Sequence, residues 1–546
     1  MLSLLKDFSP LVRRNSIDLE MKEQESYQAG TELSPMPMAA EGVKADDCNS
    51  KSKNRSLSFS DYLLADSNHG IHRRARGNSL VTEERGKKKT LGMFALCSLT
   101  YYSVSGGPFG FESVVQAGGP FWALVGFALI FVWALPEALI TIEMSIVFPQ
   151  SSGSVAWVEA AYGAKWGFMK GWLSLLSGIA DNSLYPLLFL DCVVHLFVDD
   201  EGEEPSWSEN YTLRYVITCA ITLVLAYVNY RGLDLVGKLA IFVCLFTLAP
   251  FVVFCVLGSF KVQPHRWSQG PTGGFKDVNW RLLLNTFYWN LNYWDSADTF
   301  SGDVISPEKN YPTGILLAVL LVFMSTFLPI LVGTGAYEGD WSDWSDGFFI
   351  TLGVEIIGPW LGYWMLLAST LTNVGMFEAE MSSDAWQVAG MAERGIIPKI
   401  FGQRSKHESP HYGVLLSLVG VLFITVMDFT SVIDLLNMLF CFSQALEFMA
   451  YLKLKAEYPA LHKPWKVPLP DFVITGMLVL PICFTAVIIY FSSAQALLIS
   501  TVLAFVGFVV HFVIEKARVE EWCAFEPYVP WSSGMHEKLG DLYLAQ

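Results

Sequence analysis

Charged residues are scarce in this sequence. Asp, Glu, Lys and Arg make up 16% of its 546 residues, whereas 52% are hydrophobic. Soluble domains carry about 25% charged residues, so the composition excludes an ordinary soluble protein and predicts an all-α integral membrane protein. The formal net charge of −16 gives no reason to expect a nucleic-acid partner.

The sequence also lacks the patterns of metal, disulfide and cofactor sites. Its nine cysteines form no CxxC pair, and most lie inside apolar runs, as small core residues do. Residues 232–238 have P-loop spacing, but Leu239 stands where a hydroxyl should bind magnesium, and no strand precedes it. With no nucleophile–base pair either, we expect no enzyme, no cofactor and no metal, and an ATP-driven pump is disfavoured.

Residues 1–90 contain no apolar core of the kind found in a cleavable signal peptide. They are rich in Ser, Asn, Glu, Lys and Arg and poor in aromatic residues, which predicts a disordered tail. Arg85 and the lysines at 87–89 directly precede the first apolar segment. Since positive charge concentrates on the cytoplasmic side of a membrane, we expect this tail to be cytoplasmic.

Hydropathy predicts twelve membrane spans after the tail. Their limits are 91–118, 120–147, 165–197, 213–230, 234–258, 280–304, 312–335, 350–384, 411–428, 431–454, 472–491 and 494–515. The predicted inner loops carry Lys and Arg, and two outer loops are acidic, although the outer loop 259–279 departs from this trend. We therefore expect a core of ten spans (91–470), two further spans (471–515) and a cytoplasmic C-terminal tail (516–546).

The first span is interrupted in its middle. Residues 105–110 read SGGPFG, and Pro108 has no N–H and clashes with the preceding helical turn. In lipid such a break survives only where it is buried in protein or lines a wet cavity. The break indicates a binding site, with a structural kink as the alternative.

The sixth span carries a second group of polar residues near its middle. These are Asn290, Asn292, Asp295 and Asp298. Such groups are costly in lipid and mark substrate or ion pathways. Because the two interrupted spans lie five apart, we expect two five-helix halves in inverted repeat, with the site between them.

The third span adds an acid and a tyrosine on one helix face, Asp181 and Tyr185. Pro186 leaves the carbonyl of Asn182 without its helical partner, which provides one more acceptor. We favour a binding role for Asp181 and Tyr185, and the alternative is a polar cluster that ties helices together. For Asp191, the sequence does not decide between a binding role and a structural polar cluster.

Several long motifs together resemble one family. They are SGGPFG (105–110), PEA (136–138), GIADNSLYP (178–186), WNLNYWD (289–295) and MSSD (381–384) followed by MAERG (391–395). In this order they resemble the plant polyamine uptake transporters of the amino acid–polyamine–organocation superfamily, over roughly residues 90–470. The resemblance implies a LeuT-type fold and proton-coupled import of putrescine, spermidine, spermine or paraquat-like dications.

The chemistry of a polyamine agrees with these residues. A polyamine carries several ammonium groups and no carboxylate, so it needs buried carboxylates and aromatic faces. An amino acid would place its carboxylate on N–H groups in the first break, where Pro108 supplies none. Gly106 and Gly107 still have theirs, so a carboxylate site is disfavoured and not excluded. The expected substrate site comprises Ser105, Gly106, Gly107, Asp181, Asn182, Tyr185, Trp289, Asn290, Asn292, Tyr293, Trp294 and Asp295, with Asp298 as a further candidate. For the aromatic residues, packing or lipid contact is an equal alternative.

Proton coupling has several candidate residues. Lys238 resembles the lysine that replaces sodium in proton-coupled relatives, and an inner-boundary charge is the alternative. Embedded acids that could relay protons, or only pair within the bundle, are Glu137, Glu143, Glu378 and Glu380.

The leading hypothesis is a proton-driven polyamine symporter, most often a plasma-membrane protein, although family members also occur in internal membranes. A proton-coupled amino acid transporter or exchanger of the same superfamily is the first alternative, and a non-transporting sensor is the second. Residues 198–212 contain no cysteine, so we expect no disulfide-linked heavy chain. Asn210 is a candidate glycosylation site.

Overall fold

The computed structural model describes residues 89–528 except 196, 198–204, 206, 209, 428, 459–464 and 468. The predicted disordered tail (1–90) therefore lies almost entirely outside the described residues, as does the acidic loop at 199–204.

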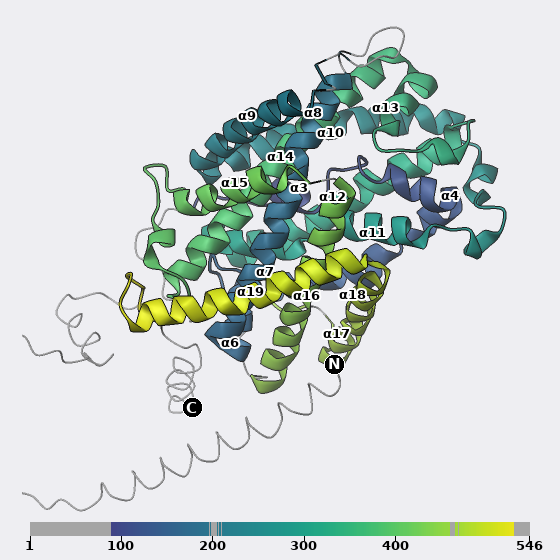
Figure 1. Cartoon of the computed structure of the whole chain (residues 1–546). Coiled ribbons are helices and arrows are strands. Elements are labelled where there is room, and N and C mark those ends of the chain that lie inside the picture. The colour runs from purple at the N-terminus through teal and green to yellow at the C-terminus, as the bar shows by residue number, and fades with distance from the viewer. Residues whose placement is uncertain are drawn as a thin grey trace, which may run out of the picture. The chain divides into compact units, whose positions relative to one another are not determined.

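The described chain is helical, and its one β-bridge is an isolated contact between Leu91 and Val304 (Figure 1). The α-helices are α3 (Met93–Val104), α4 (Glu112–Gly126), α5 (Leu135–Val147), α6 (Ser154–Tyr162), α7 (Ala164–Asn182), α8 (Leu184–His195), α9 (Tyr211–Tyr230), α10 (Leu233–Gly258), α11 (Trp280–Leu291), α12 (Pro307–Ala336), α13 (Phe348–Leu352), α14 (Pro359–Glu393), α15 (His411–Ile424), α16 (Phe429–Glu457), α17 (Asp471–Met477), α18 (Val479–Phe491) and α19 (Ala494–Val519). A π-helix, η1 (Ile130–Ala134), joins α4 to α5, and a 3-10 helix, η5 (Trp294–Asp303), follows α11.

Seven helical segments of the described chain are long and apolar enough to span a membrane. These are Ala164–Val194, Tyr211–Tyr230, Leu233–Lys261, Pro307–Ala336, Ser431–Glu457, Phe472–Phe491 and Ala494–Val519. Shorter apolar helices are Met93–Val104, Phe348–Ile357 and His411–Ile424. Multiple apolar helices confirm an integral membrane protein, whereas the count of twelve spans stays a prediction.

Both expected interruptions are present. Helix α3 ends at Val104 and α4 begins at Glu112, and between them Gly107 and Gly110 have φ of 79° and 86°. Glycine adopts this left-handed region without steric cost, so these glycines permit the sharp turn. In the second interruption α11 ends at Leu291 and η5 begins at Trp294, with Tyr293 also left-handed at φ 67°.

The two interrupted segments lie against each other. The Asn290 side-chain amide donates to the Gly110 carbonyl at 3.2 Å. At the other end, the Leu91 N–H donates to the Asp303 carbonyl at 3.1 Å, and the Ile305 N–H donates to the Leu91 carbonyl at 2.9 Å. Helix α3 thus lies beside η5, and α4 lies beside α11, so both breaks reach the same region of the interior.

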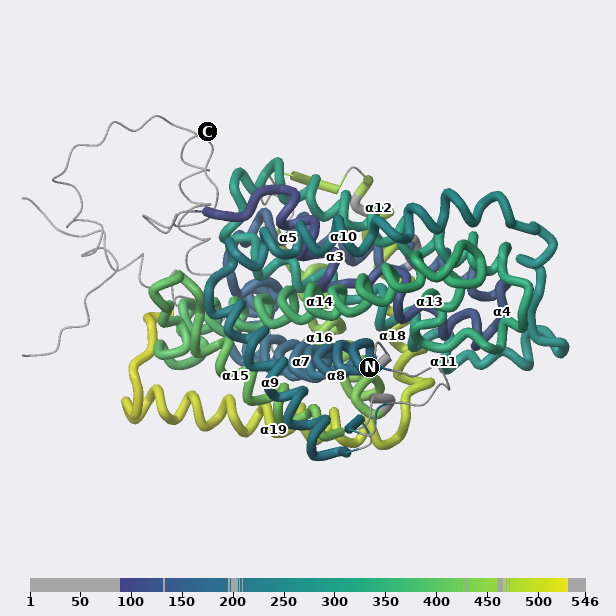
Figure 2. Tube along the Cα trace, turned by 90° about the horizontal axis from the view of Figure 1, so that it is seen from above, coloured from purple at the N-terminus to yellow at the C-terminus, as the bar shows by residue number. Residues whose placement is uncertain are grey.

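Helix α14 passes through the centre of the described bundle (Figure 2). It contacts α3, α7, α8, α10 and α15, while α16 packs on α7 and α19 covers the outer side of both α7 and α16. Small residues allow these close approaches: at Gly375, an added Cβ would lie 2.8 Å from the Tyr102 ring. Small residues at contact points are how membrane helices approach closely.

The first residues of the predicted C-terminal tail (516–546) pack against the rest of the protein. Helix α19 continues to Val519, and the residues after it return to the loop that follows α14. The Lys399 N–H donates to the Ala524 carbonyl at 2.9 Å, and the Lys399 ammonium pairs with Glu526 at 2.6 Å. The Tyr528 hydroxyl donates to Glu159 of α6 at 2.7 Å. Residues 516–528 are therefore part of the packed protein.

The contact of α14 with the turn before α6 is tight enough to test. A Cβ at Gly390 would lie 2.1 Å from the Ser152 backbone nitrogen. Because backbone atoms cannot rotate away, we predict that Gly390→Ala costs about 1–3 kcal/mol of stability. The measurement is the apparent Tm of the purified protein in detergent. Gly476→Ala in α17, where nothing lies within 4 Å of the new Cβ, is the matched control and should keep the wild-type Tm. Equal Tm values for the two variants would contradict this packing.

Candidate functional site

Asp181 forms the centre of a hydrogen-bonded group drawn from three helices. It lies near the end of α7, with 1% of its surface exposed. Its carboxylate accepts from the hydroxyl of Tyr185 in α8, and from the indole N–H of Trp289 in α11 at 2.9 Å. The structure therefore brings together three of the residues that the sequence predicted for the site.

Two further acids, Glu380 and Asp384, face the same stretch of α7 from α14. A Cβ at Gly178, one turn before Asp181, would lie 2.3 Å from Asp384 Oδ1 and 2.6 Å from Glu380 Oε1. Asp181, Glu380 and Asp384 interact electrostatically with one another, and each is at least 97% buried. We call these three residues the acidic trio.

The acidic trio has no basic partner within the described part of the chain. The ion pairs there involve other acids, and Asp384 is neutralised by nothing stronger than a hydrogen bond from the Ser417 hydroxyl at 3.0 Å. Burying a carboxylate without a cation is costly, and three together are more so. Such a group is suited to receive cationic groups from a ligand, or protons.

Two buried amides, Asn182 and Asn292, lie at the edges of the same region. Neither the oxygen nor the nitrogen of either side chain has a hydrogen-bond partner, and both residues are fully buried. Buried polar groups in proteins are nearly always paired, so unpaired amides next to Asp181 and in the second break indicate groups that bind a polar ligand or water. Both were predicted for the site.

In the first break, backbone N–H groups form hydrogen bonds with side chains of the same segment. The Gly107 N–H donates to the Ser105 hydroxyl at 3.1 Å, and Gly106 packs against Met376 of α14. The Gly110 N–H donates to Glu112 Oε2 at 2.7 Å. Glu112 is fully buried at the start of α4, where the helix dipole favours negative charge, and its other oxygen has no hydrogen-bond partner.

Asp295, which the sequence predicts to bind a ligand ammonium, is buried beside an ammonium of the protein itself. Its carboxylate lies 2.8 Å from the ammonium of Lys170 in α7. Lys170 is fully buried, and it also donates to the Ser443 hydroxyl at 2.8 Å and pairs with Glu447 at 3.4 Å. A ligand ammonium would therefore share the Asp295 carboxylate with Lys170, and the role of Asp295 in substrate binding stays a prediction.

Three other residues of the sixth span have contacts within the protein. The Asn290 amide bridges the two breaks through Gly110 and also donates to the Thr286 carbonyl at 3.0 Å. The Tyr293 hydroxyl bonds the Ser177 hydroxyl at 2.7 Å, and the Trp294 indole donates to the Leu291 carbonyl at 2.9 Å. These side chains shape the second break rather than present free polar groups to it.

The proton-coupling candidates are placed in different environments. Lys238 is at the surface, 72% exposed and paired with Asp234 at 2.6 Å, so it cannot act as a buried cation in this arrangement. Glu137 accepts from the Gln444 amide at 2.6 Å, and Glu378 accepts from the Asn229 amide at 2.6 Å. Glu143 accepts from the Tyr451 hydroxyl at 3.4 Å.

The candidate glycosylation residue, Asn210, caps α9. Its side-chain oxygen accepts from the Leu213 N–H at 3.1 Å. This bond uses the side-chain oxygen, and the residue is exposed.

Four functional candidates were missed from the sequence: Lys170, Glu447, Glu112 and Asp384. Lys170 follows closely on the predicted start of the third span at 165, where a positive charge ordinarily belongs to the membrane boundary. Glu447 and Glu112 lie inside predicted spans, and the rule that embedded acids mark functional sites would have found both.

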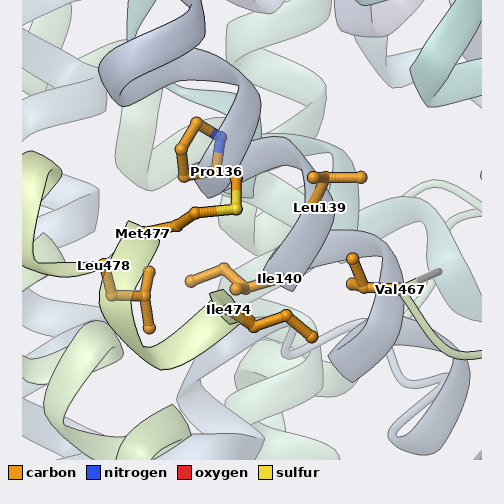
Figure 3. A pocket seen from close by; sticks show the side chains of 7 residues that line it. All are labelled: Pro136, Leu139, Ile140, Val467, Ile474, Met477 and Leu478. Carbon is orange, nitrogen blue, oxygen red and sulfur yellow. The ribbon is translucent and has the colours of Figure 1, made fainter. Parts of the chain in front are cut away.

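A small pocket lies apart from this chemistry. It is lined by apolar side chains of α5, of α17 and its neighbouring residues, as Figure 3 shows, namely Pro136, Leu139, Ile140, Val467, Ile474, Met477 and Leu478. Since none of these side chains is charged or polar, the pocket does not suit a cationic ligand.

Comparisons with known proteins agree with the helical membrane architecture. The amino acid permease family model matches residues 91–514. The polyamine transporter RMV1 of Arabidopsis thaliana is 40% identical over 438 residues, which cover 80% of this chain and 88% of RMV1. The polyamine transporter PUT1 of Oryza sativa subsp. japonica is 39% identical, with 80% of each chain covered. The arginine/ornithine antiporter ArcD2 of Lactococcus lactis is 22% identical, over 80% of this chain and 93% of ArcD2.

Removing the buried ammonium of Lys170 should strongly destabilise the protein. Lys170→Met leaves Asp295 and Glu447 without a cation, and breaking a buried ion pair from one side costs about 3–5 kcal/mol. We predict a strongly lowered apparent Tm in detergent. Lys238→Met removes an exposed lysine from an i,i+4 pair worth about 0.3–0.5 kcal/mol, so it serves as the control and should change the Tm little. Similar Tm shifts for both variants would contradict the assignment of the buried pair.

Proposed function

The chain belongs to the amino acid permease family of membrane transporters, and from this premise we propose that it imports polyamines by proton symport. The observation that carries the proposal is the acidic trio, three buried carboxylates without a basic partner in the described chain. A polyamine supplies the missing positive charges in the form of ammonium groups on a flexible chain.

The surroundings of the acidic trio support a cationic substrate. The aromatic rings of Tyr185 and Trp289 adjoin the carboxylate of Asp181, with which both form hydrogen bonds. Aromatic faces stabilise desolvated cations by about 2 kcal/mol or more. Asn182 and Asn292 add buried amide oxygens that can accept from an amine. In this proposal the ammonium groups bind the acidic trio, while their methylene linkers contact the rings.

Glu112 supports a polyamine over an amino acid. An amino acid in this fold places its carboxylate at the start of the half-helix after the first break. Here the Glu112 carboxylate lies at that helix start and accepts a hydrogen bond from the Gly110 N–H at 2.7 Å. When Glu112 is ionised, it would repel a substrate carboxylate at this position, and like charges at close range cost several kcal/mol.

The names of the relatives also favour a polyamine as the substrate. RMV1 and PUT1 are named polyamine transporters and align over most of this chain. The antiporter ArcD2, named for arginine and ornithine, is much less similar. An amino acid transporter of the same family is the second candidate function.

We further propose the finer architecture expected for this family. Twelve spans would form two five-helix halves in inverted repeat and two additional spans, with both termini in the cytoplasm. The adjoining breaks after Val104 and Leu291 support this pairing of halves, because each half contributes one interrupted helix. The plasma membrane is the proposed location, and no disulfide-linked subunit is expected.

Reconstituted transport tests the proposed function. The purified protein in liposomes is given labelled spermidine with and without an inward proton gradient, and excess leucine or arginine is added as a competitor. Gradient-dependent spermidine entry that neither amino acid inhibits is the expected result. Entry of leucine or arginine instead would favour the second candidate function, and no transport of any of them would favour a non-transporting sensor.

The role of Asp181 gives a direct prediction. Asp181→Asn keeps the side-chain size and removes a buried charge, so we predict that spermidine uptake falls at least about tenfold, the effect of losing one charged hydrogen bond. Asp191→Asn is the matched control, because Asp191 is half-exposed and pairs with Arg214. Uptake in this control should stay near wild type. Equal uptake by the two variants would remove Asp181 from the site.

Glu112 gives a prediction about substrate choice. Glu112→Gln keeps an acceptor for the Gly110 N–H but removes the negative charge, so a substrate carboxylate is no longer repelled. We predict that arginine inhibits spermidine uptake about tenfold better in this variant than in wild type. Ser113→Ala, one residue along the same helix, is the control and should leave the inhibition unchanged. An unaltered arginine inhibition curve for Glu112→Gln would contradict this role.

A further inference from the structure

Lys170 is surrounded by more acids than one ammonium can neutralise. Besides Asp295 at 2.8 Å and Glu447 at 3.4 Å, it interacts electrostatically with Asp298 and Glu137. All four acids are at least 96% buried. We call Lys170, Glu137, Asp295, Asp298 and Glu447 the lysine cluster.

The charge balance of the lysine cluster requires something besides Lys170. Four ionised carboxylates and one ammonium would leave a buried net charge of −3, which is costly in a low-dielectric interior. No second Lys or Arg forms an ion pair with these acids in the described part of the chain. Protons on some of the carboxyl groups are the remaining means of neutralisation, because like charges in close proximity favour protonation.

Free oxygens on the acids provide places for these protons. Asp295 Oδ1, Asp298 Oδ2 and Glu447 Oε1 are buried and have no hydrogen-bond partner. Glu137 has one oxygen on the Gln444 amide and one oxygen free. Each acid of the lysine cluster therefore has at least one unpaired buried oxygen, which is unusual for buried polar atoms.

The lysine cluster joins a broken helix to continuous ones. Asp295 and Asp298 lie on η5, directly after the left-handed Tyr293, whereas Lys170 and Glu447 lie on α7 and α16. A proton on Asp298, which lies on η5, or on Glu447, which lies on α16, weakens the attraction to Lys170 and so changes how firmly these elements are held against α7. Proton binding and the position of η5 are thus linked. A proton that binds more tightly in one position of η5 shifts the equilibrium toward that position.

Other titratable side chains face the lysine cluster from neighbouring elements. Tyr288 of α11 interacts with Glu137, Tyr293 interacts with Asp295, Tyr311 of α12 interacts with Asp298, and Glu380 of α14 interacts with Asp295. Through Glu380, the lysine cluster adjoins the acidic trio.

We propose that the lysine cluster is the site where the co-transported proton binds, separate from the acidic trio that binds the substrate. The inference rests on the proposed proton symport and assigns its proton site. In each cycle a proton from the outer water forms an O–H bond on one carboxylate, and Lys170 loses one ionic partner. Release of that proton to the inner water restores the carboxylate and its pair with Lys170.

Two assays on the same proteoliposomes test this assignment. In the first, an inward proton gradient drives net uptake of labelled spermidine. In the second, labelled spermidine exchanges with unlabelled spermidine inside, at equal pH on both sides. Glu447→Gln removes a proton site with little change of shape. We predict that the gradient no longer accelerates spermidine uptake by this variant, while its spermidine exchange remains measurable. Asp298→Asn should give the same pattern and serves as a second variant if Glu447→Gln folds poorly.

The outcomes separate this inference from the proposed function. Glu338→Gln, at an acid with 79% side-chain exposure, is the control and should match wild type in both assays. If Glu447→Gln and Asp298→Asn both exchange spermidine and retain wild-type stimulation by the gradient, the proton site is wrong and polyamine transport stands. If the wild-type protein does not exchange spermidine at all, the proposed function is wrong, and the proton site assigned from it is rejected with it.

Discussion

The ion pair between Lys170 and Asp295 determines how the centre of this protein is arranged. Its two members come from α7 and η5, and Glu447 and Ser443 bring α16 to the same ammonium. Taking both charges out of water costs several kcal/mol per ion, so the pair is stable only while its geometry holds. Because η5 follows the second break directly, the pair fixes the position of that break against α7. Acids that Lys170 does not reach, those of the acidic trio, are left available for a substrate.

Much of the architecture was readable in the sequence because its causes are local. The proline and glycines of the first break stop the helix wherever the chain places them, and the observed break covers the same residues. The face shared by Asp181 and Tyr185 follows from helical spacing alone. The contact of Trp289 with Asp181 was not predicted, because it joins two helices whose residues lie 108 positions apart in the chain. The packing of residues 516–528 was not predicted, because it depends on contacts distant in sequence, such as that of Lys399 with Glu526.

The roles of individual acids were not readable, because each depends on partners far away in the chain. Asp295 has the position of a ligand-binding acid, and only the structure shows that it lies against Lys170, 125 residues earlier in the chain. Lys238 resembled an interior cation, but the turn of α10 places it at the surface beside Asp234. Conversely, Glu380 and Asp384 join Asp181 only because Gly178 lets α14 approach α7 closely. Spacing within one helix predicts a face, and it does not predict what lies opposite that face.

The central claim is that this interior has two acidic groups with different occupants, the protein's own lysine and the ammonium groups of a substrate. A structure determined with bound spermidine tests it most directly. We predict ligand nitrogens within hydrogen-bonding distance of Asp181 and of Glu380 or Asp384, with the Lys170 ammonium still on Asp295. A ligand nitrogen on Asp295, with Lys170 displaced from it, would contradict the claim.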